Sequence, residues 1–239
     1  MQPKIYIGCS GWSYKDWTDV FYPKNLSTRD YLSHYVRFFN TVEINNTFYN
    51  FPTEKAVQSW ELQAPSGFKY SLKANKSITH INHFKNVQEL LKRLYGLSDI
   101  LAEKTGCFLF QFPPSFPFTP EALENLITQL DNRYHNVVEF RHKSWWNSSV
   151  IQAFHTSNIG FCSVNGFKLP EDLIAINKRA YLRLHGDPPY SSLYSYQELS
   201  SLIQKINSSS LDEVWIYFNN TKKAYAVQNA LQLKRYINE

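Results

Sequence analysis

Short apolar segments alternate with longer segments of helical periodicity along the whole chain. Eight segments have the length and the β-branched or aromatic content of buried strands. They are residues 5–10, 41–46, 68–74, 107–112, 137–141, 160–165, 180–185 and 214–219. Such regular alternation of strand and helix signals is typical of repeated βα units, which build a parallel sheet.

The intervening segments predict helices of different strength. Residues 87–101 repeat leucine and valine with the period of an α-helix. Thr119 is a suitable N-cap with Pro120 in the first helical position, and residues 222–237 carry a further apolar stripe. The segment after the sixth strand, residues 169–176, offers about two turns at most. We therefore expect the fold to be irregular around its sixth helix.

Eight βα units in 239 residues predict an α/β fold of the TIM type, a (β/α)8 barrel of eight parallel strands with outer helices. We expect a single domain over residues 1–239, because no linker or low-complexity tract interrupts the pattern. An open, doubly wound sheet is the alternative. The first βα turn, Gly8-Cys9-Ser10-Gly11-Trp12, argues against it because it lacks the G-x-G-x-x-G fingerprint of dinucleotide binding.

Alternate residues of each strand form two rows, since side chains point to opposite faces. One row is apolar, as Val138 and Phe140 are in the fifth strand, and is expected to face the helices. The other is expected to face the barrel axis and is polar near the carboxyl ends of the strands, where TIM barrels carry their active sites. We therefore expect its polar members to converge on one cavity: Glu43, Lys73, Gln111, Glu139, Arg141, Arg183, His185 and Asn219.

The basic members of this row predict an anion site. Arg141, Arg183 and Lys73 carry donors suited to phosphate or carboxylate, and the arginines can bind in bidentate fashion. Aromatic and amide side chains at the same ends would complete the contacts with a substrate. The predicted substrate-binding residues are Trp12, Asn45, Lys73, Gln111, Arg141, Trp145, Arg183, Asn219 and Asn220.

The candidate catalytic residues are Glu43 and Glu139 as general bases and His185 as a proton shuttle. His80, in the loop after the third strand, is a weaker candidate, for which a structural role is the simpler interpretation. A structural ion pair is the alternative for Glu139 with Arg141. Because burying several charges costs several kcal/mol per ion unless partners are well placed, the convergence of charges favours a ligand site.

No cofactor motif is evident in the sequence. Glu43, Glu139 and His185 could form an open tripod, so a divalent metal is not excluded, although the surrounding donors favour an anion. Cys9, Cys107 and Cys162 lie far apart and suggest neither disulfides nor a zinc site. With no membrane span or signal-peptide pattern, we expect a cytoplasmic protein. The sequence does not determine the oligomeric state.

Seven blocks of the sequence, in order along nearly the whole chain, resemble the YecE-like family, also called domain of unknown function 72. The blocks are IGCSGWSY (7–14), FNTVEINNTFY (39–49), FKYSLKA (68–74), LFQFPPSF (109–116), VEFRHKSW (138–145), YLRLHG (181–186) and YFNN (217–220). The resemblance implies a TIM-barrel-like fold and an uncharacterised function. The segment between the sixth and seventh strands is short compared with what the family usually carries.

The leading hypothesis is an enzyme, a hydrolase, lyase or isomerase, that uses acid/base chemistry on a phosphate- or carboxylate-bearing small molecule. The first alternative is a nucleic-acid-binding or nucleic-acid-processing protein with an aromatic, basic-lined cleft. The formal charge of +5 permits this but is too small to establish it. The second alternative is a protein that binds a ligand without catalysis.

Overall fold

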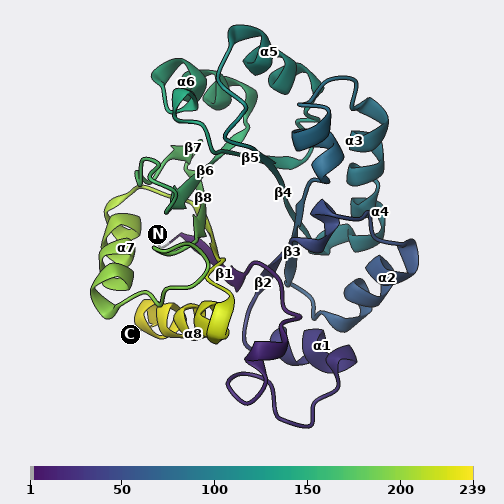
Figure 1. The fold of residues 1–239 in the computed structure, drawn as a ribbon, viewed down its shortest axis with the longest axis vertical. Coiled ribbons are helices and arrows are strands. Elements are labelled where there is room, and N and C mark those ends of the chain that lie inside the picture. Colours follow the sequence, from purple (N-terminus) through teal and green to yellow (C-terminus); the bar gives the residue numbers. More distant parts are fainter. Residues whose placement is uncertain (1–2, 239) are drawn as a thin grey trace.

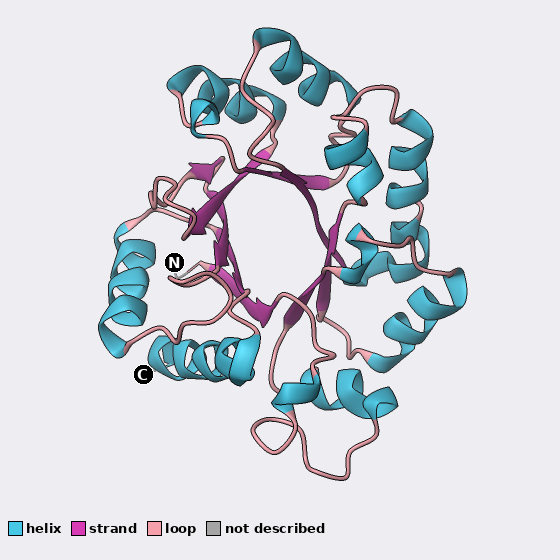
Figure 2. Ribbon diagram, viewed as in Figure 1, coloured by secondary structure: helices cyan, strands magenta, loops and turns pink. Residues whose placement is uncertain are grey.

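The computed structural model describes residues 3–238, so residues 1, 2 and 239 of the expected domain lie outside it. Its main sheet runs in the order β1-β9-β8-β6-β5-β4-β3-β2, all parallel, and curls into the ring seen in Figure 2. The strands are β1 Lys4–Cys9, β2 Thr41–Ile44, β3 Lys69–Lys73, β4 Thr105–Phe112, β5 His135–Phe140, β6 Gly160–Asn165, β7 Ala175–Ile176, β8 Arg179–Leu184 and β9 Glu213–Phe218. The predicted TIM-type α/β barrel is confirmed.

The helices lie outside the ring of strands (Figure 1). They are α1 Tyr31–Tyr35, α2 Glu54–Gln63, α3 Gln88–Tyr95, α4 Leu97–Leu101, α5 Pro120–Gln129, α6 Ser148–Ser157, α7 Tyr196–Ser208 and α8 Tyr225–Asn238. α5 starts as predicted, with the Thr119 hydroxyl accepting a hydrogen bond from the Ala122 amide. Gly96 separates α3 from α4 within the expected helix 87–101. No helix within residues 3–238 has the length and apolar character needed to cross a bilayer.

The prediction of a helix over residues 169–176 is wrong. This part of the chain instead ends in β7, which pairs antiparallel with β8. Asn177 and Lys178 both have positive φ, 49° and 60°, as the two central residues of a hairpin turn of the I′ type require. The end of the expected helix, residues 175 and 176, therefore forms the first strand of a β-hairpin. A cavity of about 350 Å³ lies on the outer side of β6 and β8, between that face and α7.

The two rows of strand residues lie as the sequence predicts. Val138 and Phe140 belong to the large cluster formed with the helices. A second, smaller cluster fills the barrel interior and consists of Tyr6, Cys107, Leu109, Val137, Cys162, Val164, Leu169, Tyr181, Trp215 and Tyr217. The barrel is therefore a packed core rather than a pore, and its polar residues lie above this core at the carboxyl ends of the strands.

The barrel closes between β1 and β2, the two ends of the strand order, through side chains. Asn40 accepts a hydrogen bond from the Ile7 amide at 3.0 Å and donates one to the Ile5 carbonyl at 2.9 Å, so it replaces two ladder bonds. Gly8 allows the close approach, because a Cβ there would lie 2.1 Å from the Thr41 carbonyl oxygen. Side chains and a glycine thus complete the ring.

Tyr35 spans the same junction from α1. Its buried hydroxyl accepts from the Cys9 amide at 2.7 Å and donates to the Thr41 carbonyl at 3.1 Å. Tyr35→Phe should lower the free energy of unfolding by about 2 kcal/mol, because the amide is left buried without a partner. Urea denaturation measures this, with the exposed Tyr196→Phe as the matched control. Equal stability of the two variants would contradict the role of Tyr35.

Candidate functional site

An arginine clamped between two glutamates forms the centre of the candidate site. Arg183, on β8, donates to Glu43 of β2 through Nη2 at 2.7 Å and Nε at 3.1 Å. Its Nη1 donates to Oε2 of Glu139, on β5, at 2.6 Å. All three side chains are buried, with exposed fractions of 1% or less. One guanidinium therefore joins three strands that lie apart in the barrel.

Glu43 accepts further hydrogen bonds besides those from Arg183. The Ser10 hydroxyl donates to Oε1 at 2.8 Å, and the Tyr181 hydroxyl donates to Oε2 at 2.6 Å. Both carboxylate oxygens are consequently occupied. Neither Ser10 nor Tyr181 is among the predicted site residues, although Tyr181 lies in the inward row and Ser10 ends the first predicted strand.

Glu139 lies between two guanidinium groups, because Arg141 donates to its Oε1 while Arg183 binds its Oε2. Burial by itself would raise the pKa of Glu139, but the positive charges of Arg141 and Arg183 outweigh burial and hold the pKa well below its ordinary range. The carboxylate therefore stays ionised and is a weak base. A proton would have to displace an arginine contact to reach it.

His185 lies on the Arg141 side of this network, with its Nε2 3.3 Å from Nη2 of Arg141 and 3.9 Å from Oε1 of Glu139. Its Nδ1 lies 3.0 Å from the side-chain amide of Asn219, which follows β9. Burial lowers the pKa of His185 well below its ordinary value, and the nearby Arg183 adds to this effect. The imidazole is therefore neutral and has one acceptor nitrogen: Nε2 accepts from Arg141, and Nδ1 carries the proton beside the side-chain amide of Asn219.

Lys73, at the end of β3, differs from the other charged groups in lacking a polar partner. Among the described residues its Nζ makes no hydrogen bond, and it lies 4.4 Å from the centre of the Phe48 ring. The side chain is half-buried. Burial and the nearby charge of Arg183 together lower the pKa of Lys73 to about 7, against the opposing effect of Glu139 and Glu43. At neutral pH a large share of this amine is uncharged.

His80 and Gln111 lie beside Lys73. The ring of His80 has Nδ1 2.8 Å from the Thr79 hydroxyl and Nε2 3.5 Å from the Gln111 amide nitrogen. Burial, with the charge of Lys73, lowers the pKa of His80 to about 4, so the ring is neutral at pH 7. His80 lies in a short π-helical turn, Ser77–Ile81, and not in a loop as expected, and this turn places it beside the charged cluster.

Trp12 and Asn45 line a separate cavity of about 280 Å³ between the loops after β1 and β2. Ser10 lies on its wall and connects it to Glu43. The side-chain oxygen of Asn45 is buried without a hydrogen-bond partner among the described residues. Trp12 and Asn45, both predicted to bind substrate, therefore lie next to the charged cluster, and the side-chain oxygen of Asn45 is free to accept a hydrogen bond.

Trp145 and Asn220 do not lie with the other predicted residues. Trp145 is fully buried and stacks on Phe140, at 3.9 Å between ring centres, so it belongs to the layer between strands and helices. Asn220 donates to Ser192 and to Asn229 of α8. The expectation that these two residues face the cavity is wrong, because Trp145 packs between the strands and the helices and Asn220 is held by its hydrogen bonds to Ser192 and Asn229.

Phe167 covers the exposed side of Arg141. The guanidinium carbon lies 3.7 Å from the centre of the Phe167 ring, in cation–π geometry. Phe167 lies in a turn after β6, where its backbone has a positive φ of 61°, and this turn places the ring over the guanidinium. No pattern in the sequence identifies this contact, because many turns contain an aromatic residue that packs against no arginine.

Among the described residues, no group of three or more His, Cys, Asp or Glu is placed to hold a metal ion.

A family model described as "Protein of unknown function DUF72" matches residues 6–239. The chain belongs to the DUF72 family. Its fold is similar to that of a DUF72 family protein from Thermotoga maritima, with a TM-score of 0.89 and 30% identity over 99% of this chain and 100% of that one. A DUF72 family protein from Enterococcus faecalis has a TM-score of 0.83 at 21% identity, covering 98% and 96% of the two chains. The resemblance seen in the sequence is thereby confirmed.

Two curated relatives of this DUF72 chain carry only family-type names. The UPF0759 protein YecE of Escherichia coli is 28% identical over 59% of this chain and 50% of its own length, so the match spans about half of that relative. The UPF0759 protein YunF of Bacillus subtilis is 23% identical over 96% of this chain and 93% of its own. These names assign no reaction, and the function has to be argued from the site.

Glu139→Gln tests the central network. The substitution leaves two guanidinium groups facing one neutral amide, so we expect the free energy of unfolding to fall by about 3 to 5 kcal/mol. Urea denaturation at pH 7 provides the measurement. The exposed Glu124→Gln on α5 is the matched control and should change stability by less than about 0.5 kcal/mol. A similarly small loss for Glu139→Gln would show that the ion pairs are not needed for folding.

The lowered pKa of Lys73 predicts a dependence of stability on pH. Between about pH 7 and 10 the unfolded chain holds a proton on Lys73 that the folded protein has released, so the free energy of unfolding rises with pH. Relative to Lys73→Met, the wild-type value should rise by about 1 kcal/mol per pH unit between pH 7 and 9. Urea denaturation at stepped pH measures it, and Lys76→Met reports the general effect of losing a lysine. A difference that stays constant with pH would refute the shift.

Proposed function

We propose that this DUF72 protein is an enzyme that acts on a small molecule carrying a phosphate or carboxylate group, at the carboxyl ends of the barrel strands. The observation that carries the proposal is an excess of positive charge. Glu43 and Glu139 are balanced by Arg183 and Arg141, and this leaves Lys73 without a counter-charge. An anionic substrate would supply the missing negative charge.

The arrangement of donors supports the same conclusion. Arg183 uses all its nitrogens on glutamates and is almost completely buried, so it would act by positioning the carboxylates. Arg141, by contrast, uses Nε for Glu139 and Nη2 for His185, and among residues 3–238 its Nη1 has no hydrogen-bond partner. We therefore assign anion binding to Arg141.

The acid/base group of this proposal is Lys73, with His80 beside it. A general base works best when its pKa lies near the working pH, and the pKa of Lys73 lies at about 7. Glu139 is too weak a base for this purpose, and both oxygens of Glu43 already accept hydrogen bonds. We assign to both glutamates the positioning of the arginines. His185, neutral and held by Arg141 and Asn219, would orient the anion-binding guanidinium.

Buried charge of this kind is costly in a protein that needs only a stable barrel. Apolar side chains of similar volume at these positions are often as stabilising as an ion-pair network, or more so. The opposite end of the same barrel interior shows the apolar solution, with Tyr6, Cys107 and Trp215 packed together. The polar end is therefore better explained by ligand binding than by folding.

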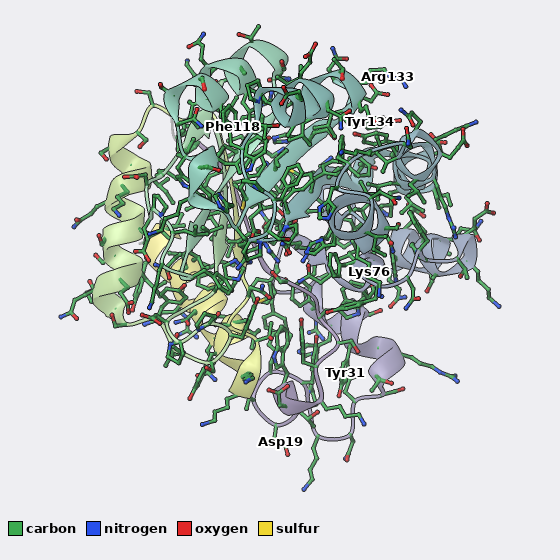
Figure 3. All side chains as sticks on the ribbon, turned by 45° about the horizontal axis from the view of Figure 1, so that its top comes forward. Asp19, Tyr31, Lys76, Phe118, Arg133 and Tyr134 are labelled. Carbon is green, nitrogen blue, oxygen red and sulfur yellow. The ribbon has the colours of Figure 1, made fainter. Side chains whose placement is uncertain are left out.

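Binding of inorganic phosphate and of succinate tests the proposal. Perturbation of the histidine ring resonances by each anion measures the affinity at low ionic strength. Arg141→Gln should weaken binding roughly 10- to 100-fold, the loss expected for one charge-assisted contact. Arg133→Gln is the matched control, because Arg133 is an exposed arginine at the edge of the molecule (Figure 3). Circular dichroism checks that both variants fold.

Two outcomes would overturn the proposal. In one, neither anion perturbs the wild-type protein. In the other, the Arg133 and Arg141 variants weaken binding equally, as expected for general attraction to a basic protein. Binding of single-stranded DNA that depends steeply on salt, without binding of the small anions, would favour the nucleic-acid alternative instead.

A further inference from the structure

We propose that Lys73 is a nucleophile that forms an imine with the carbonyl carbon of a substrate that also carries a carboxylate or phosphate. The substrate class would be short 2-oxo acids and phosphorylated aldehydes or ketones. This inference rests on the proposed function, since Arg141 would bind the anionic group while Lys73 attacks the carbonyl group. It adds to that function a covalent step and a reaction class.

The surroundings of the amine provide the first argument. A buried lysine normally forms an ion pair, and two carboxylates lie in this cluster. Both carboxylates are occupied by arginines, and among the described residues Nζ of Lys73 has no hydrogen-bond or salt-bridge partner and lies over the face of the Phe48 ring. Nζ makes no hydrogen bond within residues 3–238, but it is not fully buried and therefore remains accessible to solvent. An amine without acceptors is free to react.

The charges around the amine provide the second argument. Burial is the main cause that disfavours a positive charge on Lys73, and the charge of Arg183 adds to it, whereas Glu139 and Glu43 oppose both effects only in part. A neutral amine is the nucleophilic form of lysine, and lysines near other cations or in apolar surroundings are the ones that form Schiff bases in enzymes. The position of Lys73 at the carboxyl end of a barrel strand matches where catalytic residues of this fold lie.

The covalent step needs no oxidant, reductant or cofactor. The nitrogen lone pair attacks the carbonyl carbon to form a C–N bond as the C=O π bond breaks, and one N–H proton passes from the nitrogen to the oxygen to give a neutral carbinolamine. A proton from solvent then protonates the hydroxyl group, the C–O bond breaks with loss of water, and the remaining nitrogen lone pair forms the iminium between Nζ and carbon. The iminium draws electrons from the adjacent C–H or C–C bond, which supports isomerase or lyase chemistry.

The iminium would also be stabilised where it forms. It carries the same positive charge as a protonated lysine, but the anionic group of the bound substrate now lies beside it and offsets the repulsion from Arg141 and Arg183. The Phe48 ring, 4.4 Å from Nζ, favours a cation at this position by about 0.5 to 2 kcal/mol. The anion and the carbonyl group are thus required in the same molecule, which defines the substrate class.

Reductive trapping tests the proposal on the full wild-type chain. The protein is incubated at pH 7 with glyoxylate, a carbonyl compound with an adjacent carboxylate, and sodium cyanoborohydride, which converts an imine into a stable N-carboxymethyl group. Peptide mass spectrometry locates the modified lysines. Lys76, exposed and three residues further along, is the internal control in the same peptide region (Figure 3).

We expect Lys73 to be modified at least roughly tenfold faster than Lys76, because a pKa near 7 makes about half of its amine reactive at pH 7. Acetaldehyde, which lacks the carboxylate, should lose this preference. Arg141→Gln should lose it for glyoxylate as well, while Arg133→Gln should retain it. Excess phosphate should slow the labelling of Lys73 and leave that of Lys76 unchanged.

Modification that follows solvent exposure, with Lys73 no faster than Lys76, would overturn the imine. Equal labelling of Lys73 by glyoxylate and acetaldehyde would overturn the anionic substrate class. If phosphate and succinate bind through Arg141 but Lys73 is not labelled, the proposed function stands and only the covalent step fails. If Lys73 is labelled but neither anion binds, the anion-binding function fails instead.

Discussion

The contact of Arg183 with Glu43 and Glu139 is the interaction on which the carboxyl end of the barrel depends. It joins β8 to β2 and β5 through the barrel interior, where no backbone hydrogen bond can reach. Three charges buried together are tolerated only because each is paired and hydrogen-bonded. Because Arg183, Glu43 and Glu139 are paired with one another, the other side chains of the site have fewer charged partners, and this, together with burial, determines their pKa values.

Lys73 shows this most clearly. Its amine is unusual because its neighbours are already paired, and its own side chain has no special feature. The charges of Arg141 and Arg183 also make Glu139 a weak base. Burial, together with the charge of Arg183, keeps His185 a neutral ring between Arg141 and Asn219. The sequence suggests that the glutamates are the bases and the lysine is an anion ligand, whereas the geometry favours the lysine for proton transfer. The pKa of a buried group depends on its neighbours in space.

Barrel closure between β1 and β2, and the replacement of the expected sixth helix, also depend on a few individual residues. Asn40 and Tyr35 replace ladder hydrogen bonds between β1 and β2, and the contact requires a glycine at position 8. Beside β8, a tight hairpin replaces the expected helix, and a cavity lies between β6, β8 and α7. The barrel accepts both irregularities because the remaining parallel pairings are continuous.

The fold could be predicted from the sequence alone, because the alternation of strand residues and the repeated βα pattern are local signals. The sequence also determined that Glu43, Glu139, Arg141 and Arg183 share one face of the barrel. Only the tertiary structure decided which charge pairs with which, that Trp145 and Asn220 turn outward, and that Lys73 is left unpaired. Pairing among buried charges depends on distances between residues up to 140 positions apart, and no local pattern encodes them.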